Sequence, residues 1–170
     1  MVGVAGLPSG VVTFLFTDVV GSTRLWEADP AATSLAMARH DELIETAVVA
    51  AGGVLVRPRG EGDSRFAVFI SPTAALTAAA DFSVALAGEL WPTSVPIRVR
   101  AAVGTGEADV RAGDYYGDVV NRTARLRSVG PTIVGTVGGT PSPCRRPTEP
   151  NQGMERGTQE FLGALLRASG

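Results

Sequence analysis

Short runs of β-branched and aromatic residues alternate with alanine-rich segments along this chain, and this alternation limits its possible folds more than any other feature. The runs with strand composition lie at 11–17, 54–59, 64–70 and 95–105. The first of them, VVTFLFT, is apolar almost throughout, which is typical of a strand buried on both faces. Helical spacing of apolar residues predicts helices over 30–51 and 72–91, and we expect a further short helix over 118–128.

The order of these elements predicts an α+β fold with a ferredoxin-like βαββαβ core. Right-handed crossovers then give one antiparallel sheet with both long helices packed on one face. In this arrangement the end of the first strand lies beside the start of the third. Asp18 closes the first strand and Asp63 opens the third, so we expect two carboxylates that are distant in sequence to meet at one edge of the sheet.

Such a pair of carboxylates, with no His or Cys at ligand spacing, suits a hard cation such as Mg²⁺ or Mn²⁺. Two such ions about 3.5–4 Å apart can hold the attacking and leaving oxygens of a phosphoryl transfer. The alternative at this point is that Asp18 and Asp63 are ordinary solvated turn residues.

The loop after the first strand is a second candidate for phosphate chemistry. Backbone N–H groups at a helix start can bind polyphosphate, with glycine allowing close approach and a hydroxyl capping the helix. The loop residues are Val19, Val20, Gly21, Ser22 and Thr23, of which Ser22 or Thr23 is predicted to be the cap.

Length, charge and cysteine content narrow the classes of protein to which the chain can belong. The 170 residues suffice for one domain, and the net charge of −2 gives no general attraction to nucleic acid or an anionic membrane. All fifteen basic residues are arginines. The single cysteine, Cys144, excludes an intrachain disulfide, and neither a signal peptide nor a spanning segment is apparent. We therefore expect a cytoplasmic protein.

Three motifs together resemble the signature blocks of the class III adenylyl/guanylyl cyclase catalytic domain, in its short actinobacterial form. They are FTDVVGSTRLWE at 16–27, GEGDSRFAVF at 60–69 and GDYYGDVVNRTARL at 113–126. They occur in the family's order and spacing and span about 11–129. The resemblance implies a catalytic domain over 1–130, with active sites shared between the two chains of a homodimer.

The resemblance also implies roles for individual residues. Asp18 and Asp63 match the metal-binding aspartates, which hold two Mg²⁺ or Mn²⁺ ions per site. Asn121 matches the residue that orients the ribose, and Arg125 matches the residue that contacts the phosphates. A spacing of four places Asn121 and Arg125 on one helix face, although a plain polar face would look the same.

Arg59 and Asp114 match the two positions that select the base. Adenylyl members usually carry lysine at the first position and guanylyl members glutamate, so Arg59 departs from both patterns. Arginine only donates and an ionised aspartate only accepts, and this pair complements N1 and N6 of adenine. The expected substrate is ATP, cyclised to 3′,5′-cyclic AMP and pyrophosphate. GTP in another pose is the alternative.

The end of the chain departs from the family. Residues 131–150 are rich in Pro, Gly and Thr, and 154–168 could form an amphipathic helix, so 131–170 is predicted to be an atypical tail resembling a truncated or frame-shifted end. The family places a charge-stabilising lysine in this part, and this sequence has none. Losing such a donor costs on the order of 10²–10³ in rate, so we expect low activity. The candidate substitutes are Arg145, Arg146 and Arg156.

Two other readings stay open. One is a catalytically silent pseudo-cyclase that serves as a dimerisation or nucleotide-sensing module, and the other is a ferredoxin-like regulatory domain with a different ligand. Among the remaining residues, we expect Trp26, Phe66 and Phe69 in the core or an interface. We expect His40 on the surface of its helix.

Overall fold

The computed structural model describes residues 7–56, 62–129 and 134–136. The elements follow in the order β1 (Gly10–Val19), α1 (Ser22–Ala28), α2 (Pro30–Ala50), β2 (Val54–Val56), β3 (Ser64–Phe69), α3 (Pro72–Gly88), β4 (Val99–Arg111), β5 (Asp114–Tyr116), α4 (Asp118–Val129) and β6 (Val134–Thr136). Among these described residues, no helix is both long and apolar enough to span a membrane. The predicted loop over 131–150 lies almost entirely outside the described residues, and the predicted helix over 154–168 lies wholly outside them.

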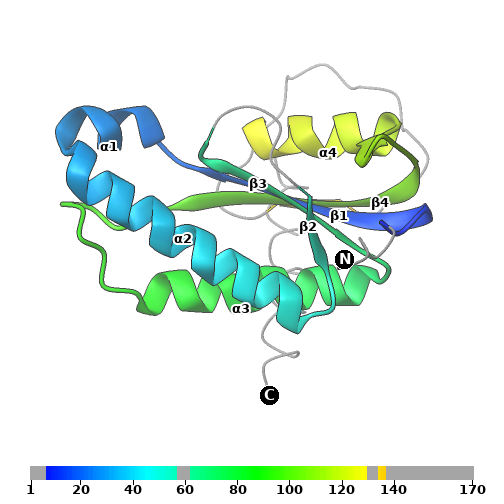
Figure 1. Cartoon of the computed structure of the whole chain (residues 1–170), viewed down its shortest axis with the longest axis horizontal. Coiled ribbons are helices and arrows are strands. Elements are labelled where there is room, and N and C mark those ends of the chain that lie inside the picture. The colour runs from blue at the N-terminus through cyan, green and yellow to red at the C-terminus, as the bar shows by residue number, and fades with distance from the viewer. Residues whose placement is uncertain (1–6, 57–61, 130–133, 137–170) are drawn as a thin grey trace, which may run out of the picture.

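The strands form one sheet in the order β2-β3-β1-β4-β5, and β6 pairs in parallel with β4. β1 is central and runs antiparallel to both β3 and β4, so that Phe16 stands opposite Phe66 on one side and Ala102 on the other. Helices α2 and α3 pack on one face of the sheet, and α4 covers the other (Figure 1). The predicted α+β fold with a ferredoxin-like core is confirmed.

The central position of β1 follows from its residues. Val12 to Val19 are all buried, and alternate side chains face opposite sides of the sheet. Leu15 and Val19 pack with α2 and α3, whereas Phe14 and Phe16 pack in the core under α4. The prediction of a strand buried on both faces is confirmed.

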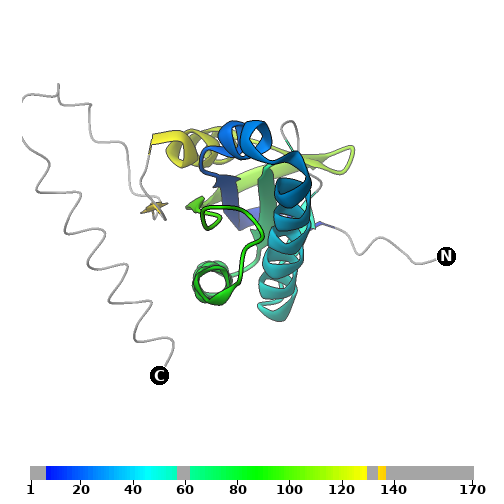
Figure 2. The same cartoon turned by 90° about the vertical axis from the view of Figure 1, so that its left-hand side faces the viewer.

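The start of α2 is marked by Asp29 and Pro30. A residue before proline is disfavoured in the helical region, and Asp29 is extended at φ −156°. Its carboxylate accepts the Ala32 N–H at 2.9 Å and so caps α2. The chain therefore turns sharply between α1 and α2 at the end of the molecule seen in Figure 2.

The segment 106–117, which lies between the last predicted strand and the predicted short helix, is mostly strand. β4 continues to Arg111 and turns into β5 through Ala112 and Gly113, which both have positive φ. This two-residue turn matches the twist of a hairpin. β4 also begins at Val99, four residues later than predicted, and Pro96 in the preceding stretch has no N–H to donate to a sheet.

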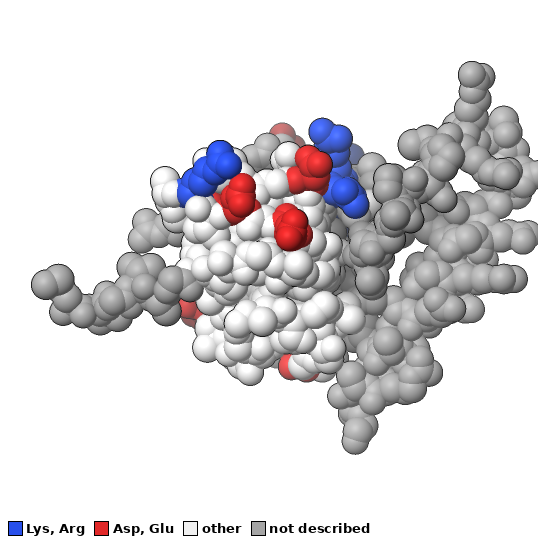
Figure 3. Space-filling view, turned by 90° about the vertical axis from the view of Figure 1, so that its right-hand side faces the viewer, with Lys and Arg blue, Asp and Glu red and all other residues white. Residues whose placement is uncertain are grey.

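Charges of both signs lie together at the end of the sheet where β1 begins. Figure 3 views this end and shows arginine and acidic side chains gathered in its upper part, with further acidic side chains at its left and lower edges. In the hairpin, the Arg111 guanidinium donates to Asp109 at 3.2 Å.

The prediction that His40 lies on the surface is wrong. His40 is fully buried, because it faces α3 and its ring lies nearly perpendicular to that of Phe82, with the ring centroids 5.5 Å apart. Trp26, expected in the core or an interface, is 42% exposed in the single chain, so it is not a core residue and its place in an interface stays a prediction. Phe66 and Phe69 are buried as expected.

Candidate active site

The structure brings Asp18 and Asp63 to the same edge of the sheet. Asp18 stands opposite Ser64 in the pairing of β1 with β3, and Asp63 directly precedes β3. The Val19 N–H donates to the Asp63 carbonyl oxygen at 3.2 Å. The two backbones are thus neighbours at this edge, as the topology predicted.

The Asp18 carboxylate is paired with Arg100, which lies opposite it on β4. The Arg100 Nε donates to Asp18 Oδ2 at 2.8 Å, and the guanidinium Nη2 contacts the same oxygen. Asp18 is buried, so a positive charge beside it offsets the cost of removing the carboxylate from water. Sequence reasoning did not single out Arg100, although its place in a strand of alternating pattern was a usable signal.

The Asp63 carboxylate has one buried oxygen, Oδ1, without a hydrogen-bond partner among the described residues. A buried and unpaired carboxylate oxygen is costly, and a bound cation would remove that cost. In the described ranges, no three residues of the types His, Cys, Asp and Glu gather around one point. A cation at Asp18 and Asp63 would take its other ligands from water, backbone or phosphate oxygens, as Mg²⁺ commonly does.

The loop 19–23 leaves fewer backbone N–H groups available to a phosphate than predicted. The Val19 N–H is engaged with Asp63, and the Val20 N–H donates to the Arg98 carbonyl oxygen at 2.8 Å. The predicted cap by Ser22 or Thr23 is wrong, because Gly21 takes the cap position at φ 69° and no side chain caps α1. The Ser22 and Thr23 N–H groups lie in the first turn, where a helix supplies no partner of its own.

A pocket of about 270 Å³ lies between the sheet and α4. Its walls are aromatic and polar side chains, among them Phe16, Phe66, Tyr115, Asp114, Asn121, Ser64 and Arg127. The structure therefore brings Asp114 and Asn121 together. Arg125 is exposed and does not line this pocket, and Arg59 lies outside the described residues.

Hydrogen bonds fix several polar groups of this pocket. Asp114 Oδ1 accepts the Tyr115 N–H at 2.9 Å, and the Arg127 Nη1 donates to Ser64 Oγ at 3.0 Å, which ties α4 to β3. Burial raises the pKa of Tyr115 to about 12, and its hydroxyl donates to the Pro8 carbonyl oxygen at 2.6 Å. Tyr115 is therefore a neutral wall of the pocket.

Helix α4, which carries Asn121 and Arg125, sits unusually close to β4. A Cβ atom on Gly104 would lie 1.9 Å from Thr123 Oγ1, and one on Gly106 would lie 3.1 Å from the Val119 side chain. The Thr123 hydroxyl cannot turn away freely, because it donates to the Val119 carbonyl oxygen at 2.7 Å. Glycine at position 104 is what allows this approach.

Comparisons with known proteins point to one family. No model of a protein family matches the chain. An uncharacterized protein of Mycobacterium tuberculosis is 42% identical over 123 residues, which are 72% of this chain and 40% of that protein. The adenylate cyclase of Schizosaccharomyces pombe is 33% identical over 147 residues, covering 72% of this chain and 9% of the enzyme. The chain thus spans well under half of the length of these relatives.

Solved structures agree in fold. A Trypanosoma brucei adenylate cyclase in its monomeric state superposes with a TM-score of 0.68 at 26% identity, covering 76% of this chain and 73% of the other. The adenylate/guanylate cyclase/hydrolase of Silicibacter pomeroyi superposes with a TM-score of 0.57 at 28% identity, covering 71% and 70%. With the three motifs and the shared edge of Asp18 and Asp63, these likenesses establish that the chain belongs to the class III adenylyl/guanylyl cyclase family.

Proposed function

We propose that the chain cyclises ATP to 3′,5′-cyclic AMP and pyrophosphate at a homodimer interface, with a divalent cation site at Asp18 and Asp63. The observation that carries this proposal is the junction of β1 and β3 in a cyclase fold. The backbones that carry the two aspartates are neighbours there, and Asp63 Oδ1 is buried without a described partner. Two Mg²⁺ or Mn²⁺ ions, when bound there, would activate the ribose 3′-hydroxyl and neutralise charge on the phosphates.

The pocket under α4 supports a purine substrate. The stacked rings of Phe16 and Phe66, with centroids 4.3 Å apart, form an apolar wall against which a planar base can pack. Asp114 can accept from the N6 amino group of adenine, and Arg59 is proposed to donate to N1. This donor and acceptor set is the reason for preferring ATP over GTP.

The chemical step needs little covalent participation by the protein. The ribose 3′-oxygen attacks the α-phosphorus, and the bond from that phosphorus to the bridging oxygen of pyrophosphate breaks. Asn121 is proposed to hold the ribose, Arg125 to stabilise the charge that develops on the phosphates, and the Ser22 and Thr23 N–H groups to contact the polyphosphate.

A homodimer is supported by the separation of these groups within one chain. Asp114 and Asn121 share a pocket that Asp18 and Asp63 do not line, and Arg125 is exposed and does not line it either. A second subunit that supplies the cation site would complete the set, and two-fold symmetry would generate two equivalent sites. Val20 and Trp26, both more than 40% exposed, lie close in sequence to Asp18 and offer apolar contact area.

A silent pseudo-cyclase is the second candidate, and one observation favours it. The sequence contains no lysine to stabilise the phosphate charge. In this case the chain would bind nucleotide without turnover.

The test is to incubate the purified chain with ATP or GTP and Mn²⁺, and to measure cyclic nucleotide and pyrophosphate. Asp18→Asn keeps the size of the side chain and should lower the rate at least about 100-fold, because a cation ligand is lost. Asp81→Asn, at an exposed position of α3, is the matched control and should leave it unchanged. Wild-type product no higher than that of Asp18→Asn would eliminate the cyclase, and nucleotide binding without product would identify the pseudo-cyclase. Sedimentation of the free protein tests the dimer separately.

A further inference from the structure

Arg65 holds the turn that carries Asp63 from both sides. Its Nη1 donates to the carbonyl oxygen of Gly62 at 3.3 Å and to that of Ser64 at 2.9 Å, the two residues adjacent to Asp63. The side chain is largely buried, with 16% of its surface exposed. One planar guanidinium thus bonds to both ends of a three-residue segment.

Arg65 is itself anchored from helix α2. Its Nη2 is ion-paired with Asp41 Oδ2, and the second oxygen of Asp41 lies 2.9 Å from Nδ1 of His40. His40 is fully buried and packs against Phe82 of α3. The half-exposed Asp41 carboxylate is therefore held on its other side by a residue of the packed layer of helices.

We propose that Arg65, anchored by Asp41, is a positioning residue that holds the Asp63 turn in the place where its carboxylate binds the cation. The inference rests on the proposed function, because it takes Asp63 to be a cation ligand. None of the site roles deduced from the sequence falls on Arg65 or Asp41.

The physical reason is the cost of the unpaired carboxylate. With Oδ1 of Asp63 buried and lacking a described partner, a loosely held turn would swing this group into water. The bonds from Arg65 to the flanking carbonyl groups oppose that motion. Arginine suits the task because its fork donates to several acceptors in fixed directions, which the point charge of lysine cannot do.

Amide hydrogen exchange measured by NMR tests the position of the turn without any cation. The Val19 N–H reports on the turn because it donates to the Asp63 carbonyl oxygen, and the adjacent Val20 N–H donates to Arg98 on the other side of β1. Loss of even one hydrogen bond to a charged group should speed local opening about tenfold, and Arg65→Met removes two, so we expect an acceleration of at least about tenfold. In Arg65→Met we expect this acceleration at Val19 and not at Val20. Equal acceleration at both would mean that the end of β1 frays as a whole, and would overturn the inference.

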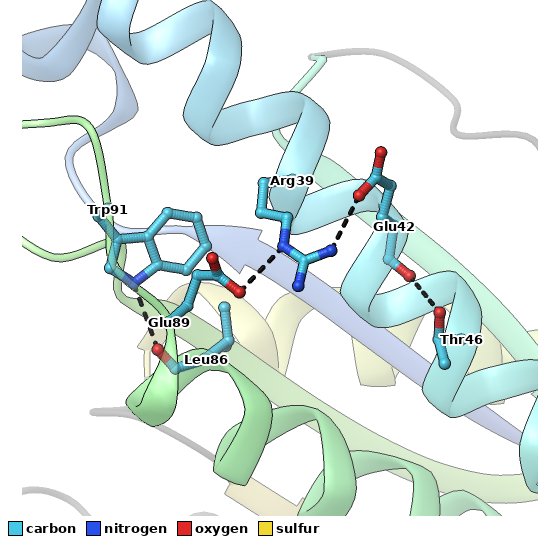
Figure 4. A network of polar contacts seen from close by, with 6 residues as sticks. All are labelled: Arg39, Glu42, Thr46, Leu86, Glu89 and Trp91. Atoms are coloured by element: carbon cyan, nitrogen blue, oxygen red, sulfur yellow. Dashed lines mark hydrogen bonds and ion pairs between the residues drawn. The ribbon is translucent and has the colours of Figure 1, made fainter.

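Arg39→Met is the matched control. Arg39 lies on α2, as Asp41 does, and forms ion pairs with Glu42 at 3.0 Å and Glu89 at 2.9 Å (Figure 4). This variant removes an ion-paired guanidinium from α2 without removing a bond to the Asp63 turn. Exchange at Val19 should stay at the wild-type rate.

Binding of Mn²⁺ alone, followed by the EPR signal of the free ion, tests the consequence for the cation. Arg65→Met and Asp41→Asn should raise the Kd for Mn²⁺ about 10- to 100-fold, as is usual when a residue that orients a ligand is lost. Arg65→Lys should recover part of the loss, and Arg39→Met should bind as the wild type does.

The two measurements separate the inference from the function on which it rests. If Asp63→Asn abolishes Mn²⁺ binding while Arg65→Met binds and exchanges as the wild type does, Arg65 has no positioning role. If the wild type itself fails to bind Mn²⁺, the proposed cation site is wrong. Exchange at Val19 then decides by itself whether Arg65 holds the turn.

Discussion

Replacing Gly104 with alanine tests whether close packing of α4 on β4 is what positions Asn121 and Arg125. The added Cβ would lie 1.9 Å from Thr123 Oγ1, whereas ordinary contacts begin at 3.4 Å, so the helix or the threonine must retreat by the difference of 1.5 Å. Thr123 is buried and its hydroxyl is bonded to the Val119 carbonyl oxygen. Overpacking of this kind costs about 1–3 kcal/mol of the free energy of unfolding.

The assay is urea denaturation together with the cyclase measurement. Gly104→Ala should lower the free energy of unfolding by about 2 kcal/mol. It should also slow cyclisation by up to about 100-fold, the cost of a displacement of roughly 1 Å in a positioned group. The second substitution Thr123→Ala removes the oxygen that clashes. The double variant should therefore be more stable than the sum of the two single effects predicts, by about 1 kcal/mol or more.

Gly88→Ala is the control for the change of residue type. A Cβ there meets nothing within 4 Å, and the residue is the last of α3, so we expect stability equal to or slightly above that of the wild type. The reasoning is refuted if Gly104→Ala is as stable as Gly88→Ala. It is also refuted if Thr123→Ala does not offset the loss.

Two further predictions concern stability. Asp29→Ala should destabilise the protein by about 1 kcal/mol in urea denaturation, because the cap of α2 is lost, and Asp29→Asn, which can still accept the Ala32 N–H, should not. The raised pKa of Tyr115 means that the folded state favours the neutral phenol. Stability should therefore be complete below about pH 10 and fall by about 1.4 kcal/mol per pH unit from there towards the folded pKa of about 12. Tyr115→Phe should have a lower free energy of unfolding at neutral pH, because it lacks the hydrogen bond to Pro8, but this free energy should not fall between about pH 10 and 12. An equal fall in the variant would show that the alkaline loss of stability does not come from Tyr115.

The core of the fold could be predicted because local pattern and tertiary packing agree there. Residues 12–17 of the run 11–17 are buried, with side chains on both faces of the sheet, and the order of this strand with the two long helices leaves one sheet topology. The meeting of Asp18 and Asp63 follows from that topology alone. A strand that lies between two others and under helices on both faces is apolar almost throughout, so its residue types alone predict its burial.

The missed features depend on contacts between distant elements. The β4–β5 turn uses Ala112 at positive φ, a conformation that alanine rarely adopts and that no local pattern indicates. His40 is buried because Phe82 and Asp41 happen to provide an apolar face and a partner. Arg100 acquires its role only when β1 pairs with β4, and Arg65 acquires its anchor only when β3 lies beside Asp41 of α2.

The separation of the proposed site into two groups leads to a test of the whole arrangement. If the cation site of one subunit works with the α4 residues of the other, Asp63→Asn damages one half of each site and Asn121→Ala the opposite half. Each homodimer is then inactive at both sites. A mixed dimer instead has one site with both defects and one with none. Random re-association of equal amounts should restore about a quarter of the wild-type sites, since half of the dimers are mixed and half of their sites are intact. A site contained within one chain would give no recovery at any mixing ratio.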